Sequence, residues 1–362
     1  MELAIVGTRG IPAKYGGFET FAEEISVRLS EMGMNVSVQC EKTNDRNPVY
    51  KGVKLFYSSI DKSNHQLRYY YEGLIWAQKN ADVAIVTGAG GAVFYFLKKF
   101  KKYIKITNTD GIESRRTKWS VFHRVFLKLC EHITAYRSDY LIADSINIRD
   151  YLLRTYKIPE KKVILIEYGA SINNAYDPRI LQEHSVEYRQ FYMVICRIEP
   201  ENNIRMIIEG YLKSNSGFPL IIIGNTNTRY GRSLKKNFDS ERVKYFGAIY
   251  NKQIIKSLRF SCKAYIHGHS VGGTNPSLLE AMANRNPCIC LDNVFNREVT
   301  NNTQLYFKTS GALAFQIKSL EKMREEEINE LRQKALDRVT RFYNWRNIVD
   351  RYINLIKIAS GE

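Results

Sequence analysis

The chain has 362 residues, of which 44% are hydrophobic and 12% aromatic, so it is excluded from the disordered class and is long enough for two cores. Lys and Arg number 54 against 37 Asp and Glu, and this net charge of +17 predicts a partner that carries phosphate: nucleic acid, anionic lipid or a nucleotide. No apolar run approaches the ~20 residues that span a bilayer, and the opening ELAIVG predicts a strand rather than a signal peptide. The cysteines form no C-x-x-C pair, which favours buried, reduced thiols in a cytosolic protein.

The first half of the chain alternates short apolar runs with stretches of helical spacing. Strands are predicted over residues 3–7, 36–40, 53–57, 83–87, 104–107, 140–143 and 163–167. Helices are predicted between them, over residues 18–32, 66–80, 92–100, 121–137 and 146–156. Such alternation indicates a parallel sheet with helices on both faces.

Residues 170–189 lose this periodicity, and we place a domain boundary there. The alternation then restarts, with strands over 191–196, 220–224, 243–246, 263–267 and 288–291, and helices over 203–212, 253–258 and 277–283. Two polar helices, 325–342 and 345–359, follow. The α/β pattern predicts two doubly wound Rossmann-like domains, 1–172 and 185–342, that face each other across a ligand-binding cleft.

A glycine-rich segment, GTRGIPAKYGGFE (7–19), joins the first predicted strand to the first helix. Gly16 and Gly17 let backbone amides approach a phosphate or a sugar, and the helix start adds a positive dipole end. Arg9 and Lys14 add formal charge. The G-x-G-x-x-G spacing of dinucleotide-binding loops is absent, so the segment indicates a different ligand.

A second segment, HGHSVGGTNPSLLE (267–280), runs from a strand through a loop into a helix. Asn275 is a good N-cap and Pro276 suits the first helical position, so free amides at this helix start predict an anion pocket. Glu280, on the following turns, could accept hydrogen bonds from a ribose diol. His267 ends the strand, but no further His, Cys or Asp set accompanies it, and we expect no metal.

Two further candidates follow predicted strand ends. Arg197, in RIEPENN (197–203), would point into the cleft as a diphosphate clamp. Asp110, in NTDGIESRRTKW (108–119), could hold a sugar hydroxyl or act as a base. Each has a plainer alternative, a surface charge for the arginine and a turn for the Asp-Gly pair.

Positive charge is concentrated in residues 98–128, which hold ten basic and only two acidic residues. On a helix, residues 93–103 would present aromatic side chains on one side and lysines on the other, a pattern typical of peripheral contact with anionic membranes. The alternative is that the apolar face packs on the sheet and the lysines are solvated. The basic residues assigned to acceptor or membrane contact are Arg9, Lys14, Lys98, Lys99, Lys101, Lys102, Arg115 and Arg116.

With these segments in place, the chain resembles glycosyltransferase family 4 of the GT-B fold, and more narrowly the bacterial rhamnosyltransferases of polysaccharide assembly. The stretches that carry the likeness span both predicted domains: GTRGIPAKYGGFET, NTDGIESRRTKW, LIADS, RIEPENN and HGHSVGGTNPSLLEAMA. The resemblance implies a retaining, metal-independent transfer from a nucleotide-diphosphate sugar, and the absence of a D-x-D motif agrees with this.

The resemblance also implies roles for individual residues. The C-terminal domain would bind the donor, with Arg197 on the diphosphate and Glu280 on the ribose, and the last helix, 343–362, would cross back to the N-terminal domain. Where the family has a glutamate and a lysine, this chain has Gly272 and Asn202. The remaining residues assigned to the donor are Gly16, Gly17, Asn202, His267, Gly273, Thr274 and Asn275.

The implied donor is dTDP-β-L-rhamnose and the implied acceptor a saccharide on a polyprenyl diphosphate at the inner, cytoplasmic face of the membrane. A UDP- or GDP-sugar donor is the first alternative. VTGAGG (86–91), with the Tyr95 and Lys99 spacing, leaves a nicotinamide-dependent dehydrogenase or epimerase as a more distant one. A nucleic-acid binder would account for the charge, but no recognised motif supports it, and no nucleic-acid partner is expected.

Overall fold

The computed structural model of the protein describes residues 1–14, 16–96, 103–109, 111, 114 and 120–361. It divides the chain into two compact units, Met1–Tyr168 with Trp345–Glu362, and Gly169–Asn344. The division falls just before the 170–189 segment in which the sequence predicts a boundary. Within the part of the chain that the structure describes, none of the helices has the length and hydrophobicity to cross a bilayer.

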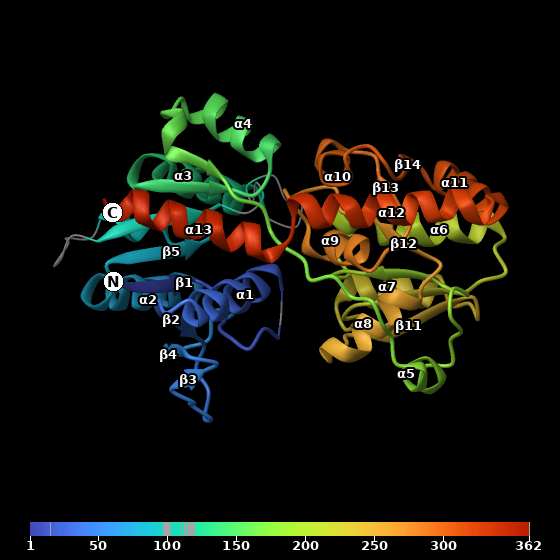
Figure 1. The fold of residues 1–362 in the computed structure, drawn as a ribbon, viewed down its shortest axis with the longest axis horizontal. Coiled ribbons are helices and arrows are strands. Elements are labelled where there is room, and N and C mark those ends of the chain that lie inside the picture. The colour runs from blue at the N-terminus through green and yellow to red at the C-terminus, as the bar shows by residue number, and fades with distance from the viewer. Residues whose placement is uncertain (15, 97–102, 110, 112–113, 115–119, 362) are drawn as a thin grey trace. The chain divides into compact units, whose positions relative to one another are not determined.

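The first unit is built on a sheet that has eight strands among the described residues, in the order β3-β4-β2-β1-β5-β6-β7-β8 (Figure 1). β3 pairs antiparallel with β4, and the other neighbours are parallel. The strands are β1 (Glu2–Val6), β2 (Asn35–Cys40), β3 (Val49–Tyr50), β4 (Val53–Tyr57), β5 (Val83–Thr87), β6 (Ile104–Asn108), β7 (Tyr140–Ala143) and β8 (Val163–Leu165).

Helices cover both faces of this sheet because the central strands are apolar on both sides. Alternate residues of β1 and β5 pack against side chains of α2 (Gln66–Asn80), the 3-10 helix η1 (Ala92–Phe96) and α3 (Val121–Arg137). On the other side α1 (Gly17–Glu31) contacts α13 (Trp345–Ser360), where the Phe21 and Tyr352 rings lie 5.5 Å apart. α4 (Ile146–Tyr156) packs beside α3 and β8.

The second unit has a fully parallel sheet with six strands among its residues, in the order β11-β10-β9-β12-β13-β14. These strands are β9 (Tyr192–Ile195), β10 (Leu220–Ile223), β11 (Val243–Gly247), β12 (Ala264–His267), β13 (Cys288–Leu291) and β14 (Leu305–Phe307). Its helices are α5 (Pro178–Glu183), η4 (Pro200–Asn202), α6 (Ile204–Ser214), α7 (Arg229–Asn237), α8 (Lys252–Ser261), α9 (Pro276–Ala283), α10 (Val294–Thr300), α11 (Ser310–Lys322) and α12 (Glu325–Phe342).

The core of the second unit forms where α6 and α11 pack together over β9, β10 and β12. Gly210 allows this close approach, since a Cβ there would lie 2.7 Å from the Ser310 carbonyl oxygen. α9 packs against α12 and β13. The predicted α/β class with two Rossmann-like sheets is therefore confirmed.

Both sheets reverse their strand order at one position. In the first unit the reversal lies between β1 and β5, and in the second between β9 and β12. Ligands of open α/β sheets bind beyond the carboxyl ends of the strands at such a switch point. The loops that follow β1, β5, β9 and β12 contain the GTRGIPAKYGG, GAGG, RIEPENN and HSVGGTN segments.

Two differences from the sequence predictions concern local structure. The helix predicted over 92–100 is, in its described part, the short 3-10 helix η1, which follows Gly90 and Gly91 where the chain packs closely against Gln66 and Tyr70. The elements that were not predicted are β3, α5, α7, α10, α11, β14 and the 3-10 helices η3 (Glu160–Lys162) and η4. β14 has only three residues, too few to show a strand periodicity, and packing against β13 defines it.

Candidate functional site

The switch point of the second unit opens because two neighbouring strands stop pairing before they end. The β9–β12 ladder contains only Tyr192–Ala264 and Met193–Tyr265, although β9 continues to Ile195 and β12 to His267. The loops beyond are tied to each other: Asn203 Nδ2 donates to the Gly268 carbonyl at 2.8 Å, and Ser270 Oγ donates to the Glu201 carbonyl at 2.7 Å. These two bonds hold the loop 197–203 and the loop 268–275 in a fixed arrangement, which we call the Arg197 frame.

Arg197 lies on this frame with a side chain that is 46% exposed. Its guanidinium is only loosely paired, 3.9 Å from Glu199 Oε1, so it can reorient towards an anion. Its backbone is held in place, because the buried Asn202 donates from Nδ2 to the Arg197 carbonyl at 2.7 Å. Asn202, predicted to contact the donor, thus positions the arginine through the main chain.

His267 ends β12 with a side chain that is only 1% exposed. Its ring stacks on His269, with centroids 4.4 Å apart, and neither ring nitrogen has a hydrogen-bond partner among the described residues. Burial lowers the pKa of His267 from 6.5 to about 3. The ring is therefore a neutral group with an unused donor and an unused acceptor.

The start of α9 offers fewer free amides than the sequence predicts. Asn275 is the N-cap, as expected, and its Oδ1 accepts from Ser277 N at 3.0 Å. Pro276 has no N–H and the Ser277 amide is taken by the cap, so neither the Pro276 nor the Ser277 position can bind an anion through its main chain. The predicted pocket is left to the loop before the helix, where Gly273 and Thr274 are buried.

Glu280 has a partner that sequence reasoning missed. Its Oε2 lies 2.7 Å from Nη2 of Arg259, a residue of α8 that is only 4% exposed. The Glu280 side chain itself is 36% exposed, so one face of the carboxylate stays open to a ligand. Arg259 fixes this carboxylate from the buried side. The sequence carries no signal for the pair, since Arg259 sits in an ordinary amphipathic helix.

The switch point of the first unit is anchored by carboxylates of α1. Glu19 and Glu23 are both buried and accept from the backbone amides of Arg9, at 2.9 Å, and Ala13, at 2.7 Å. Those amides are therefore unavailable to a phosphate. At the N-cap residue Gly16, a Cβ would meet only the Glu19 carboxylate, at 3.4 Å, so packing does not demand a glycine there.

The other residues predicted on this loop are more exposed. The side chain of Arg9 has its Nε 3.8 Å from Glu41 Oε1, whereas Lys14 and Gly17 are exposed to solvent. Buried carboxylates beside a glycine loop disfavour an anionic ligand and suit a neutral, hydroxyl-bearing one. The geometry of this loop thus agrees better with a sugar than with a phosphate.

The glycine run 88–91 is explained by packing. A Cβ on Gly91 would lie 2.7 Å from the Tyr70 ring, and one on Gly90 2.9 Å from Gln66 Nε2. Tyr95, the tyrosine of the dehydrogenase alternative, is buried with its hydroxyl 2.8 Å from Thr107 Oγ1, and burial raises its pKa. It does not supply the proton donor that this alternative requires.

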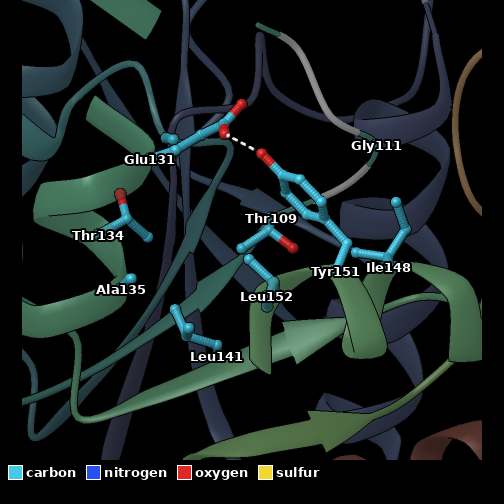
Figure 2. A pocket seen from close by; sticks show the side chains of 10 residues that line it. Thr109, Gly111, Glu131, Thr134, Ala135, Leu141, Ile148, Tyr151 and Leu152 are labelled. Atoms are coloured by element: carbon cyan, nitrogen blue, oxygen red, sulfur yellow. Dashed lines mark hydrogen bonds between the residues drawn. The ribbon is translucent and has the colours of Figure 1, made fainter. Parts of the chain in front are cut away.

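A small pocket in the first unit lies beyond β5 and β6, between α3 and α4 (Figure 2). Its polar centre is Glu131, whose carboxylate accepts from the hydroxyls of Tyr151, at 3.0 Å, and Tyr156, at 2.9 Å. Thr134 Oγ1 is buried here without a hydrogen-bond partner among the described residues. The rest of the lining is mainly apolar, and sequence reasoning missed the site because α3 and α4 meet only in the fold.

Several predicted residues lie outside the described residues. They are Lys98, Lys99, Lys101, Lys102, Asp110, Arg115 and Arg116. Of the basic helix predicted over 93–103, the structure thus describes only residues 93–96 and 103. Among the residues that the structure describes, no three or more His, Cys, Asp or Glu side chains gather in the arrangement of a metal site.

Two family models match the chain, one in each half. Residues 179–338 match "Glycosyl transferases group 1", and residues 1–171 match "Domain of unknown function (DUF1972)". No curated protein sequence matches the chain. The first match covers the strands and helices that carry Arg197, His267 and Glu280. These findings support a glycosyltransferase.

Solved structures of glycosyltransferases share the fold across almost the whole chain. Sucrose-phosphate synthase from Thermosynechococcus elongatus superposes with a TM-score of 0.82 at 15% identity, covering 98% of each chain. A glycosyltransferase from Rickettsia africae gives 0.75 at 16% identity, covering 99% of this chain and 98% of that one. Anabaena HepE in complex with UDP gives 0.75 at 13% identity, covering 99% and 100%. At such identities the likeness establishes the fold, which is GT-B.

The buried His267 predicts a specific pH dependence of stability. Its folded pKa lies below the ordinary 6.5, so the folded form is fully stabilised above pH 6.5 and loses stability as the pH falls towards 3. Between pH 6.5 and 5.0 the loss should be about 2 kcal/mol relative to a His267→Gln variant. Urea titrations at the two pH values measure it. His123→Gln, at an exposed position, is the control, and an equal loss in wild type and His267→Gln would contradict the prediction.

Proposed function

We propose that the protein is a retaining, metal-independent glycosyltransferase of family 4 that adds L-rhamnose, from dTDP-β-L-rhamnose, to a saccharide carried on a polyprenyl diphosphate. The reaction would take place at the cytoplasmic face of the cell membrane, where the enzyme would be peripherally bound. The basic segment that contains Lys98, Lys99, Lys101 and Lys102 would contribute to this binding.

The observation that carries the proposal is the frame around Arg197. An exposed, loosely paired guanidinium follows β9 at a topological switch point, a neutral imidazole ends the neighbouring strand β12, and a partly exposed carboxylate lies on α9, the next helix. A nucleotide-diphosphate sugar needs these three functions: a cation for the diphosphate, a neutral group for sugar or base, and an acceptor for a pentose hydroxyl, which in dTDP is the 3′-hydroxyl. The likeness of residues 179–338 to the glycosyl transferases group 1 supports the same interpretation.

In the proposed reaction the bond from the anomeric carbon to the diphosphate oxygen breaks, and a bond from that carbon to the acceptor oxygen forms on the same face. Negative charge develops on the departing diphosphate, where Arg197 would stabilise it. The acceptor hydroxyl gives its proton to the diphosphate or to Asp110. The acceptor would bind at the glycine loop of the first unit, whose buried Glu19 and Glu23 favour a neutral sugar.

Gly272 supports a sugar with few hydroxyls. The family has a glutamate at this position, and here a Cβ would meet nothing within 4 Å. The space is therefore open and lacks a carboxylate that could accept from a sugar hydroxyl. A 6-deoxy sugar such as rhamnose has one hydroxyl fewer to satisfy, and it leaves fewer buried polar groups unpaired.

A UDP-sugar donor is the second candidate, because the structurally similar HepE has been solved with UDP and with UDP-glucose. The same Arg197 frame would hold either nucleotide, since it addresses the diphosphate and the 3′-hydroxyl of the pentose, which both nucleotides have. The two candidates differ in the base, in the transferred sugar and in the pentose, because dTDP carries a 2′-deoxyribose with only its 3′-hydroxyl where UDP carries a 2′,3′-diol.

A thermal-shift panel without added metal separates these candidates. We expect dTDP to raise the melting temperature selectively over UDP, GDP, NAD and NADP, because a ligand that binds only the folded state stabilises it by mass action. dTMP is the control for the diphosphate and should give a smaller shift. A selective shift with UDP or GDP would retain the reaction class and reject rhamnose, whereas a shift with NAD or NADP would reject the glycosyltransferase.

A further inference from the structure

Helix α3 exposes apolar side chains where a soluble helix normally carries polar ones. Phe122 is 89% exposed, Val125 65% and Leu129 53%, and their spacing of three and four residues aligns them on one face. Tyr136, also exposed, continues the same face towards the end of the helix. The opposite face is apolar as well and packs inside the unit through Leu127, Cys130, Thr134 and Ala135. The outer stripe therefore has no role in the core of the unit.

Basic side chains line this stripe. Arg124 and Lys128, one turn apart, flank Val125, and all three line a shallow depression together with Val121 and Tyr151. The single acid of the helix, Glu131, accepts from the hydroxyls of Tyr151 and Tyr156 and also forms an ion pair with Lys128, whose Nζ lies 3.4 Å from Glu131 Oε2. The charge of Lys128 is therefore compensated, and Arg124 is the exposed cation beside Val125. The exposed face of α3 thus combines apolar anchors with positive charge and presents no carboxylate.

We infer that this face of α3, defined by Phe122, Val125, Leu129 and Arg124, docks the enzyme on an anionic lipid bilayer. Apolar side chains enter the boundary between headgroups and acyl chains, and the cations meet lipid phosphates. The inference rests on the proposed function, since it brings the protein to the surface in which a lipid-linked acceptor resides. It also moves the main anchor from residues 93–103 to a helix that the sequence predicted only as part of the fold.

The charge pattern distinguishes a bilayer from other partners. In a symmetric pair of chains, this face would bring the Arg124 side chains of both copies into one interface, and such a like-charge contact is unfavourable. A nucleic acid would pair with the cations but leave three large aliphatic and aromatic side chains in water. An anionic bilayer accommodates both kinds of side chain, because its acyl region takes up the apolar groups and its phosphates pair with the positive charge.

Co-flotation with vesicles tests the inference. We expect the wild-type protein to float with vesicles of 70% phosphatidylcholine and 30% phosphatidylglycerol, and the variant Phe122→Ser, Val125→Ser, Leu129→Ser to lose at least ten-fold in partition coefficient. Arg124→Glu should weaken binding to these vesicles and change nothing with pure phosphatidylcholine. The matched control is Phe315→Ser, at a side chain of α11 that is also exposed, which should float like the wild type.

Two results would overturn the inference. One is normal flotation of the triple serine variant, including the case in which only charge reversal at Lys98, Lys99, Lys101 and Lys102 releases the protein. The other is a change of oligomeric state in that variant, by size-exclusion chromatography, without loss of flotation. A wild type that floats but transfers no sugar to a lipid-linked acceptor would reject the proposed function and leave the docking surface standing. Because the three side chains are exposed, the variant should keep the wild-type melting temperature.

Discussion

Replacing Arg197 by alanine should lower the turnover number at least ten-fold, and by on the order of 10² if the guanidinium meets the leaving diphosphate throughout the transition state. The reason is that the diphosphate gains negative charge as the glycosidic bond breaks, and a charge-assisted, bidentate contact strengthens at that moment. Initial rates with the nucleotide-sugar donor and a lipid-linked acceptor measure the change. The melting temperature should not move, because the side chain is half exposed and loosely paired.

The matched control is Arg205→Ala, which removes an exposed arginine of α6 paired with Glu209 in the same unit. It should leave turnover unchanged. Arg197→Lys retains the charge but loses the planar fork, so it should recover only part of the rate. If Arg197→Ala turns over at the wild-type rate, Arg197 has no place in the mechanism, and the frame around it would need another ligand.

Replacing Glu280 by alanine should destabilise the second unit by about 3 kcal/mol, because it leaves the buried guanidinium of Arg259 without a counter-charge. The partial exposure of Glu280 itself places the estimate at the lower end of the range for broken buried pairs. For a unit of this size the melting temperature should fall by roughly 6–12 °C. Differential scanning calorimetry measures it, and the thermal shift with the nucleoside diphosphate should shrink as well.

The relative losses of stability in the two single variants make this prediction specific to the ion pair. Arg259→Met removes the buried charge and leaves a carboxylate that water can reach, so it should cost less than Glu280→Ala. The double variant should be more stable than Glu280→Ala alone, since it no longer buries an unpaired charge. Additive losses in the double variant would show that the two side chains do not depend on each other.

The sequence alone determined the α/β architecture, and it predicted where ligands would bind. The period of the apolar residues predicted most of the buried strands and the helices between them, because hydrophobic burial on two faces of a parallel sheet leaves a strong local signal. The cap at Asn275 and the arginine after β9 were also readable, since a cap and a strand end depend on neighbouring residues. Each of these features is set within about ten residues of chain.

Only the tertiary structure decided which of these residues meet and which groups remain free. The Arg259–Glu280 pair joins α8 to α9, and Asn202 donates to the Arg197 carbonyl. The Glu19 and Glu23 carboxylates accept from amides of the glycine loop that the sequence predicted to be available to a ligand. The exposure of Phe122 and the burial of His267 likewise follow from packing between elements distant in sequence. The spacing of residues along a chain shows which face of a helix or strand a side chain lies on, but not which side chains of other elements it meets. Hydrogen bonds and burial between elements are therefore decided when the sheets and helices pack.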